Sequence, residues 1–322
     1  MTLGQRIILF LKGMAMGAAD VVPGVSGGTI AFISGIYEEL LASIKSIGPE
    51  TVTVLRKQGV MAAWRQVNGG FLLTLVAGIG TSVLLLVHPI TWLLEHQPVL
   101  IWSFFFGLIA ASIVLCGKLV RSWSVGPIIG LVLGTAAAYA VGVAGVSAGD
   151  NESLVFFFFA GSLAICAMIL PGISGSFILL LLGAYTPVMN AIKTFDLAIV
   201  VVFAAGALLG LMAFSRLLSW MFAHKHDLTV STLTGFLLGS LTIIWPWKEV
   251  ESVRTVHAGK ADEHLAPFLT RNIWPTDYAT ITANDQLLGI TEKAPQVPGA
   301  VLLCLAGMGL LLFLERLGER RA

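Results

Sequence analysis

The chain has 322 residues, of which 57% are hydrophobic and only 11% are charged. A soluble domain carries about 25% charged residues, so this composition excludes an ordinary soluble protein and predicts an all-α, polytopic membrane protein. The formal net charge is +1, and without a long basic run the sequence predicts no nucleic-acid partner.

The first apolar region, residues 7–44, is interrupted by the sequence DVVPGVSGGT, from Asp20 to Thr29. Proline removes a backbone N–H group and glycine loosens the backbone, so this stretch breaks a helix. Each half is short for a membrane span, which needs about 20 residues. The break itself is apolar. We therefore predict a re-entrant helical hairpin whose tip stays inside the membrane, covered by protein or by a wet cavity.

The rest of the chain contains six apolar segments long enough to span a bilayer and a second interrupted region. The second interruption, MILPGISGSF from Met168 to Phe177, nearly repeats the first and predicts a second re-entrant hairpin. In chain order the predicted elements are spans 71–94, 98–117 and 124–146, the second hairpin 154–193, spans 196–222 and 228–245, an outer loop 246–297, and a last span 298–315.

Positive charge predicts how the chain is oriented. If the N-terminus is cytoplasmic and the first hairpin enters from that side, most of the 19 Lys and Arg residues fall on the cytoplasmic side. Lys118, Arg121 and Lys225 are among them. This distribution follows the positive-inside rule. We therefore expect a multi-pass protein with both termini in the cytoplasm and the loop 246–297 outside.

The two interruptions belong to an internal repeat. Pro23 and Pro171 are 148 residues apart, and after a shorter connection the spacing becomes 128, as between Gly78 and Gly206. The last spans align weakly, with Pro127 against Pro298. The predicted repeats are residues 1–146 and 147–322, each a hairpin followed by three spans.

Each repeat crosses the membrane an odd number of times, whether its hairpin is re-entrant or fully spanning. The second repeat is therefore expected to be inverted relative to the first. Inverted repeats with paired broken helices are a transporter architecture, and the breaks mark the binding site. The six scattered histidines form no recognisable nucleophile–histidine–carboxylate set, so the sequence predicts no enzyme, no metal and no cofactor.

The residues after each Pro-Gly pair predict an anion site. A serine at a helix restart can cap the new helix, whose first turn has free backbone N–H groups that bind phosphate or carboxylate. Glycine lets a ligand approach the backbone closely. The alternative is that Pro-Gly only kinks the helices and that glycine packs them together. The predicted phosphate-binding residues are Ser26, Gly27, Gly28, Thr29, Ser174, Gly175 and Ser176.

Asp20 is the most conspicuous charge within an apolar segment, where an ionisable group is a functional hypothesis by default. It could bind a coupling proton or cation, orient a basic partner such as Lys12, or cap a neighbouring N–H group. Its counterpart in the second repeat is Met168, so this role is not symmetric. Glu38, nearer the cytoplasmic mouth, is a further candidate for coupling.

Three more side chains are candidates for contact with an anionic head group. Arg216 could bind a phosphate through two N–H groups, or it could extend its charge to the membrane interface. Tyr37 and Tyr185 occupy matching positions after the two breaks. Each could donate a hydrogen bond to a head group or serve as ordinary packing.

The run GMAMGAADVVPGVSGGTIAFISGIYEELL and its echo ILPGISGSFILLLLGAY resemble the bacterial polyprenyl-phosphate transporters, over nearly the whole chain. The resemblance implies inverted repeats with re-entrant hairpins in the bacterial plasma (inner) membrane. It also implies that the chain returns the carrier lipid undecaprenyl phosphate from the outer to the inner leaflet for cell-envelope synthesis. A secondary transporter of a small water-soluble anion is the alternative. Because one chain holds both repeats, a monomer suffices; a homodimer is the other expectation.

Overall fold

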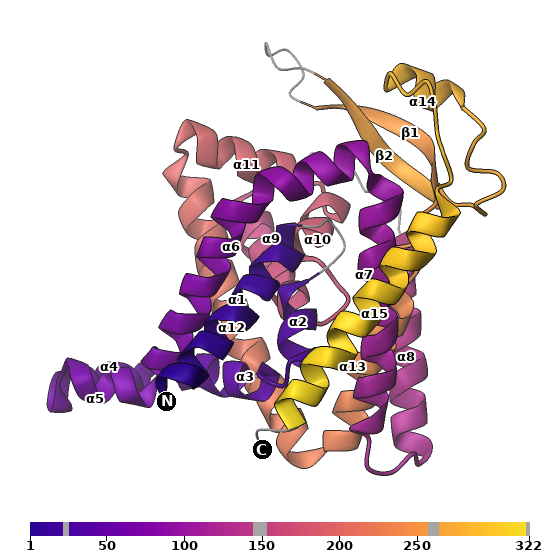
Figure 1. Ribbon diagram of the computed structural model, residues 1–322. Coiled ribbons are helices and arrows are strands. Elements are labelled where there is room, and N and C mark those ends of the chain that lie inside the picture. The colour runs from indigo at the N-terminus through magenta and orange to yellow at the C-terminus, as the bar shows by residue number, and fades with distance from the viewer. Residues whose placement is uncertain (22–25, 144–152, 257–263, 320–322) are drawn as a thin grey trace. The chain divides into compact units, whose positions relative to one another are not determined.

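The computed structural model is mostly helical and describes residues 1–21, 26–143, 153–256 and 264–319 (Figure 1). The first half contains α1 (Leu3–Val21), α2 (Gly27–Ile33), α3 (Tyr37–Ser46), α4 (Pro49–Gln58), α5 (Val60–Gln66), α6 (Gly69–His96), α7 (Pro98–Lys118) and α8 (Val125–Val143). The second half contains α9 (Leu154–Ile169), α10 (Gly175–Leu181), α11 (Tyr185–Thr194), α12 (Leu197–His224), α13 (His226–Ser240), β1 (Lys248–Val256), β2 (His264–Asn272), α14 (Ala283–Leu287) and α15 (Val297–Glu319).

Within the part of the chain that the structure describes, four helices are long and apolar enough to cross a membrane by themselves: α6, α7, α8 and α12. The count rises to five if α10 and α11, which meet at an angle of 106°, form one broken span. The prediction of a multi-pass helical membrane protein is therefore confirmed. α13 is shorter than the span predicted at 228–245, because the helix ends at Ser240 and a turn follows over 241–244.

Each predicted hairpin region contains three helices, because a second turn follows the Pro-Gly break. Gly35 and Gly183 both adopt a left-handed backbone in these second turns, with φ of +73°. Glycine takes this conformation at little cost, and it ends α2 and α10. The sequence analysis missed these turns. Pro23 and Gly24, predicted to make the first break, lie outside the described residues.

The helix bounds repeat along the chain at the spacings found in the sequence. α2 and α10, and likewise α3 and α11, start and end 148 residues apart, while α6 and α12 are 128 residues apart. The helix contacts repeat as well: a Cβ atom on Gly78 would meet the carbonyl of Phe10, and one on Gly206 would meet the carbonyl of Phe158. α6 therefore crosses α1 as α12 crosses α9.

The last helix of each predicted repeat, α8 or α15, also makes an equivalent close contact. The residues that correspond to each other differ from the match of Pro127 to Pro298. A Cβ atom on Gly134 of α8 would meet the carbonyl of Thr232, and one on Gly307 of α15 would meet the carbonyl of Phe104. Phe104 and Thr232 are 128 residues apart. Gly134 therefore corresponds to Gly307.

The chain divides into two compact units: residues 1–92 with 112–240, and residues 93–111 with 241–322. The second unit corrects the all-α prediction, because the segment expected as a loop at 246–297 contains a two-stranded antiparallel sheet. Lys248 of β1 pairs with Asn272 of β2. The sequence KEVESVRTV in β1 places a valine at every third position, without the alternation of polar and apolar residues that is typical of a strand with one covered face. The pairing of β1 with β2 shifts register between Val250 and Val253.

The second unit also holds a buried ion pair beside the sheet. Lys293 Nζ lies 2.6 Å from Asp285 Oδ1, and both side chains are buried. Thr282 caps α14 and its N–H group donates to Asp285 Oδ2 at 2.9 Å. Asn284 donates to the carbonyl of Val250 at 3.0 Å, which joins α14 to β1.

Candidate functional site

The two helix breaks are joined directly by hydrogen bonds within the first unit. Ser26 Oγ donates to the carbonyl of Met168 at 2.8 Å, and the N–H group of Gly172 donates to Thr29 Oγ1 at 2.9 Å. Ser26 and Thr29 are buried, with 1% and 0% of their surface exposed. Tyr37 adds a third bond, from its hydroxyl to the carbonyl of Ile169 at 3.2 Å. These residues, with the backbone 168–172, form what we name the break junction.

Gly27 and Gly28 let other parts of the protein, rather than a ligand, approach their backbone closely. A Cβ atom on Gly28 would meet the carbonyls of Ile169 and Met168, and one on Gly27 would lie 2.6 Å from a carboxylate oxygen of Asp20. The first position brings backbone against backbone across the break junction, so a larger residue there would push the breaks apart.

The short helix α2 is held at both ends by charged side chains. At its start, the N–H group of Gly27 donates to Asp20 Oδ1 at 2.6 Å, and that of Gly28 donates to Ser26 Oγ at 3.1 Å. At its end, Lys12 Nζ donates to the carbonyl of Ser34 at 2.6 Å. Asp20 and Lys12 thus bind opposite ends of one helix, each with the sign that complements the helix dipole.

The start of α10 differs, although its backbone repeats that of α2. The hydroxyls of Ser174 and Ser176 lie 2.9 Å apart, and Ser176 is exposed. No side chain caps α10 at Ser174 among the described residues. Met168 stands at the position equivalent to Asp20, and its Cβ atom would lie 3.3 Å from a Cβ on Gly175. An apolar side chain thus replaces the capping carboxylate beside two hydroxyl groups.

The other predicted head-group residues lie at different places. Arg216 donates to the carbonyls of Met212 at 2.7 Å and Ile47 at 3.3 Å, so it joins α12 to the C-terminal end of α3. Tyr185 begins α11 and is partly buried, whereas its counterpart Tyr37 is 2% exposed and belongs to the break junction.

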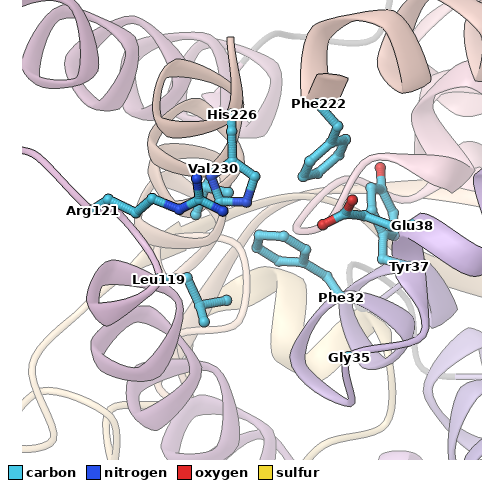
Figure 2. A pocket seen from close by; sticks show the side chains of 9 residues that line it. All are labelled: Phe32, Gly35, Tyr37, Glu38, Leu119, Arg121, Phe222, His226 and Val230. Atoms are coloured by element: carbon cyan, nitrogen blue, oxygen red, sulfur yellow. The ribbon is translucent and has the colours of Figure 1, made fainter. Parts of the chain in front are cut away.

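Glu38 lines a cavity of about 360 Å³ in the same unit (Figure 2). Arg121, from the loop after α7, and His226, from the start of α13, share this cavity with it. Phe32 and Phe222 form part of its apolar wall. The sequence analysis did not connect these residues, because Arg121 and His226 are far apart in the chain and no short motif contains both.

Comparisons with known proteins agree on one family. A family model described as undecaprenyl phosphate translocase-like (VCA0040-like) matches residues 16–261. The chain is 44% identical over 311 residues to a polyprenyl-phosphate transporter of Vibrio cholerae serotype O1, covering 97% of this chain and 96% of the relative. It is 32% identical over 256 residues to a polyprenyl-phosphate transporter of Staphylococcus aureus, covering 74% of this chain and 86% of the relative. No solved structure matches it significantly.

Proposed function

We propose that this chain, which belongs to the undecaprenyl phosphate translocase-like family, returns polyprenyl phosphate from the outer to the inner leaflet of the bacterial plasma membrane. The observation that carries the proposal is the break junction, where two interrupted helices meet inside a polytopic protein. Paired broken helices of this kind form the substrate sites of secondary transporters. The isoprenoid tail would stay in lipid while the phosphate crosses through the protein.

The two repeats are proposed to be inverted, with both termini in the cytoplasm. The repeated helix bounds support two copies of one unit, and the odd number of crossings in each predicted unit supports their inversion. Movement of one repeat against the other would expose the break junction to each side of the membrane in turn.

The phosphate is proposed to bind at the start of α10, on the hydroxyls of Ser174 and Ser176 and the adjacent backbone of Gly175. The hydroxyls are close together and Ser176 is exposed, and an apolar Met168 replaces the carboxylate that would repel an anion. In the first repeat, Asp20 already occupies the matching position on Gly27. Ser26 and Thr29 would then position the second break, since both hydroxyls are committed to hydrogen bonds.

Coupling to a proton or cation through Asp20 is a separate proposal. Its carboxylate accepts a hydrogen bond from Gly27, so loss of its charge would weaken the start of α2 and change the contact between the breaks. Transport by Asp20→Asn that keeps its dependence on the ion gradient would refute coupling through this residue and leave it as a structural cap.

The test uses proteoliposomes with a labelled polyprenyl phosphate in one leaflet, following its appearance in the other. Fast movement by the wild type that collapses in Ser174→Ala/Ser176→Ala supports the substrate and the site. The matched control is Thr53→Ala, whose exposed hydroxyl donates to the carbonyl of Pro49 in its own helix. Fast movement in every variant keeps the function and rejects the site. No movement beyond empty liposomes, with a gradient applied, favours a small-anion transporter.

A further inference from the structure

We propose that the cavity between Glu38, Arg121 and His226 is a second phosphate-binding site, from which the lipid head group leaves toward the cytoplasmic leaflet. The inference rests on the proposed function and adds a site to it. The proposed orientation places Arg121 and the neighbouring Lys118 and Lys225 on the cytoplasmic side, so the cavity opens where the head group must be released.

The lining matches an amphipathic anion. Figure 2 shows Arg121 and His226 reaching into the cavity, with aromatic rings beside them. Arg121 can offer several N–H donors to a phosphate, and a protonated imidazole can offer another. Phe32 and Phe222 can contact the first part of an isoprenoid chain. The volume of about 360 Å³ falls within the range of about 300–1,000 Å³ seen for small-ligand sites.

Asp227 connects the backbone at Arg121 to the side chain of His226. Its carboxylate accepts hydrogen bonds from the backbone N–H groups of Arg121 at 3.2 Å and Ser122 at 3.0 Å. Its Oδ1 atom also lies 3.2 Å from Nδ1 of His226. Since Nδ1 is engaged, Nε2 of His226 is the ring nitrogen left for a ligand. Asp227 is therefore a positioning residue, which joins the loop after α7 to the start of α13.

Glu38 is expected to favour release of the phosphate from this cavity. Its carboxylate lines the same cavity from α3 (Figure 2), so it repels a bound phosphate and competes with it for Arg121. A transport site must release its substrate, and a carboxylate that lines the cavity with Arg121 lowers the affinity for phosphate without closing the cavity.

Tyr37 connects the cavity to the break junction. Its ring lines the cavity and contacts the rings of Phe32 and Phe222, with centroids 5.4 and 5.9 Å away. Its hydroxyl donates to the carbonyl of Ile169 in the second break. One side chain thus belongs to both sites, which places the cavity next to the junction on the proposed route.

The test measures binding of a fluorescent short-chain polyprenyl phosphate to the purified full-length chain. It is made in the Ser174→Ala/Ser176→Ala background, where the cavity is the remaining proposed site, and repeated in the wild type. Arg121→Gln is expected to weaken binding about tenfold or more, because it removes a charge-assisted contact. Arg121→Lys should recover part of the loss. Lys225→Gln, an exposed neighbour outside the cavity, is the matched control and should bind as its parent does.

Further measurements test whether the lipid must carry a phosphate group, and they guard against misfolding. Polyprenol, which lacks the phosphate, should not compete. Leu119→Trp narrows the cavity wall without changing charge and should also weaken binding. Each variant must elute as a single species with an unchanged melting temperature. Lipid binding that is equal in Arg121→Gln, His226→Gln and the parent overturns the proposal, as does loss of all binding in the serine background.

Two results distinguish failure of this inference from failure of the proposed function. If the wild type translocates the lipid but lipid binding does not depend on Arg121, the proposed function stands and the cavity site is rejected. Binding of inorganic phosphate that depends on Arg121, in a chain that neither binds nor moves the lipid, assigns the cavity to a soluble anion and overturns its role in lipid release.

Discussion

Lys12 and Asp20 bind the two ends of the same seven-residue helix, α2: Lys12 at the carbonyl of Ser34 and Asp20 at the N–H group of Gly27. The second repeat has Ala160 and Met168 at these positions, so α10 repeats the backbone of α2 without its charges. The two repeats thus share one fold but present different electrostatics at the break junction. This difference is why we assign the anion to α10.

Met168→Asp should fill the proposed anion site with the chain's own carboxylate. The new side chain would stand where Asp20 stands in the first repeat, near Gly175 and the two serine hydroxyls. We expect the variant to fold and to lose most polyprenyl-phosphate translocation in proteoliposomes, because the carboxylate repels phosphate and takes its hydrogen-bond donors. Met168→Leu is the matched control and should transport normally. Equal transport by both variants would contradict the assignment to α10.

Lys12→Met should loosen the end of α2. The substitution keeps the apolar stem but removes the hydrogen bond to Ser34 and the favourable interaction with the helix dipole, which together contribute about 1–2 kcal/mol. A lower melting temperature in detergent is the expected result. Arg6→Gln controls for loss of positive charge, because Arg6 is exposed and lies in α1, the helix that also carries Lys12. An equal effect of both substitutions would reject a specific role for Lys12.

Sequence reasoning worked where a local pattern carries the structure. The apolar runs located the long helices, and the repeated glycines fixed their spacing, because helix crossings need a small residue at a definite place. It failed at the second turn of each hairpin, since Gly35 and Gly183 reveal their left-handed backbone only in three dimensions. It also failed at the two-stranded sheet of the second unit, because β1 has a valine at every third position and lacks the alternation of polar and apolar residues that predicts a strand.

The candidate site shows a sharper limit. Serine and glycine after Pro-Gly indicated a helix restart, but the pattern is the same whether the hydroxyl binds a ligand or the protein. Ser26 binds the carbonyl of Met168 across the junction, while Ser174 pairs with Ser176. Arg121 and His226 line one cavity because Asp227 joins the loop after α7 to the start of α13, and no short motif connects these two segments.

Gly28→Ala should disrupt the break junction. A methyl group at this position would press against two backbone carbonyls of the second break, and backbone cannot move as easily as a flexible side chain. Overpacking of this kind costs about 1–3 kcal/mol. Gly80→Ala is the control, because nothing lies within 4 Å of its added Cβ atom and alanine favours a helix. Melting temperatures should fall for the first variant and hold or rise for the second; the reverse order would contradict the close approach.

Gly78→Ala and Gly206→Ala should destabilise the chain to a similar extent. Each added methyl would meet a backbone carbonyl of the crossing helix, Phe10 in one repeat and Phe158 in the other. Because the two crossings are equivalent, we expect losses of about 1–3 kcal/mol that agree within error. The measurement is the unfolding midpoint of each single variant in the same detergent. A large effect at one position and none at the other would argue against equivalent crossings.

The ion pair between Asp285 and Lys293 should make α14 and the residues around it sensitive to acid. Burial alone would raise the pKa of Asp285, but the bonds to Lys293 and Thr282 outweigh it and hold the pKa below its ordinary value. The resulting stability is present above the unfolded pKa of about 3.9 and is lost as pH falls through the folded value.

Amide hydrogen exchange in peptides covering α14 tests this expectation. After correction for the intrinsic rate at each pH, protection in the wild type should be high at neutral pH and should fall in strong acid. Asp285→Asn leaves Lys293 buried without its partner, so it should be poorly protected at neutral pH already, with a smaller change toward acid. Glu292→Gln, an exposed acidic residue beside the pair, should behave as the wild type does. Protection in Asp285→Asn that follows the wild-type curve at every pH would show that the pair does not hold this segment.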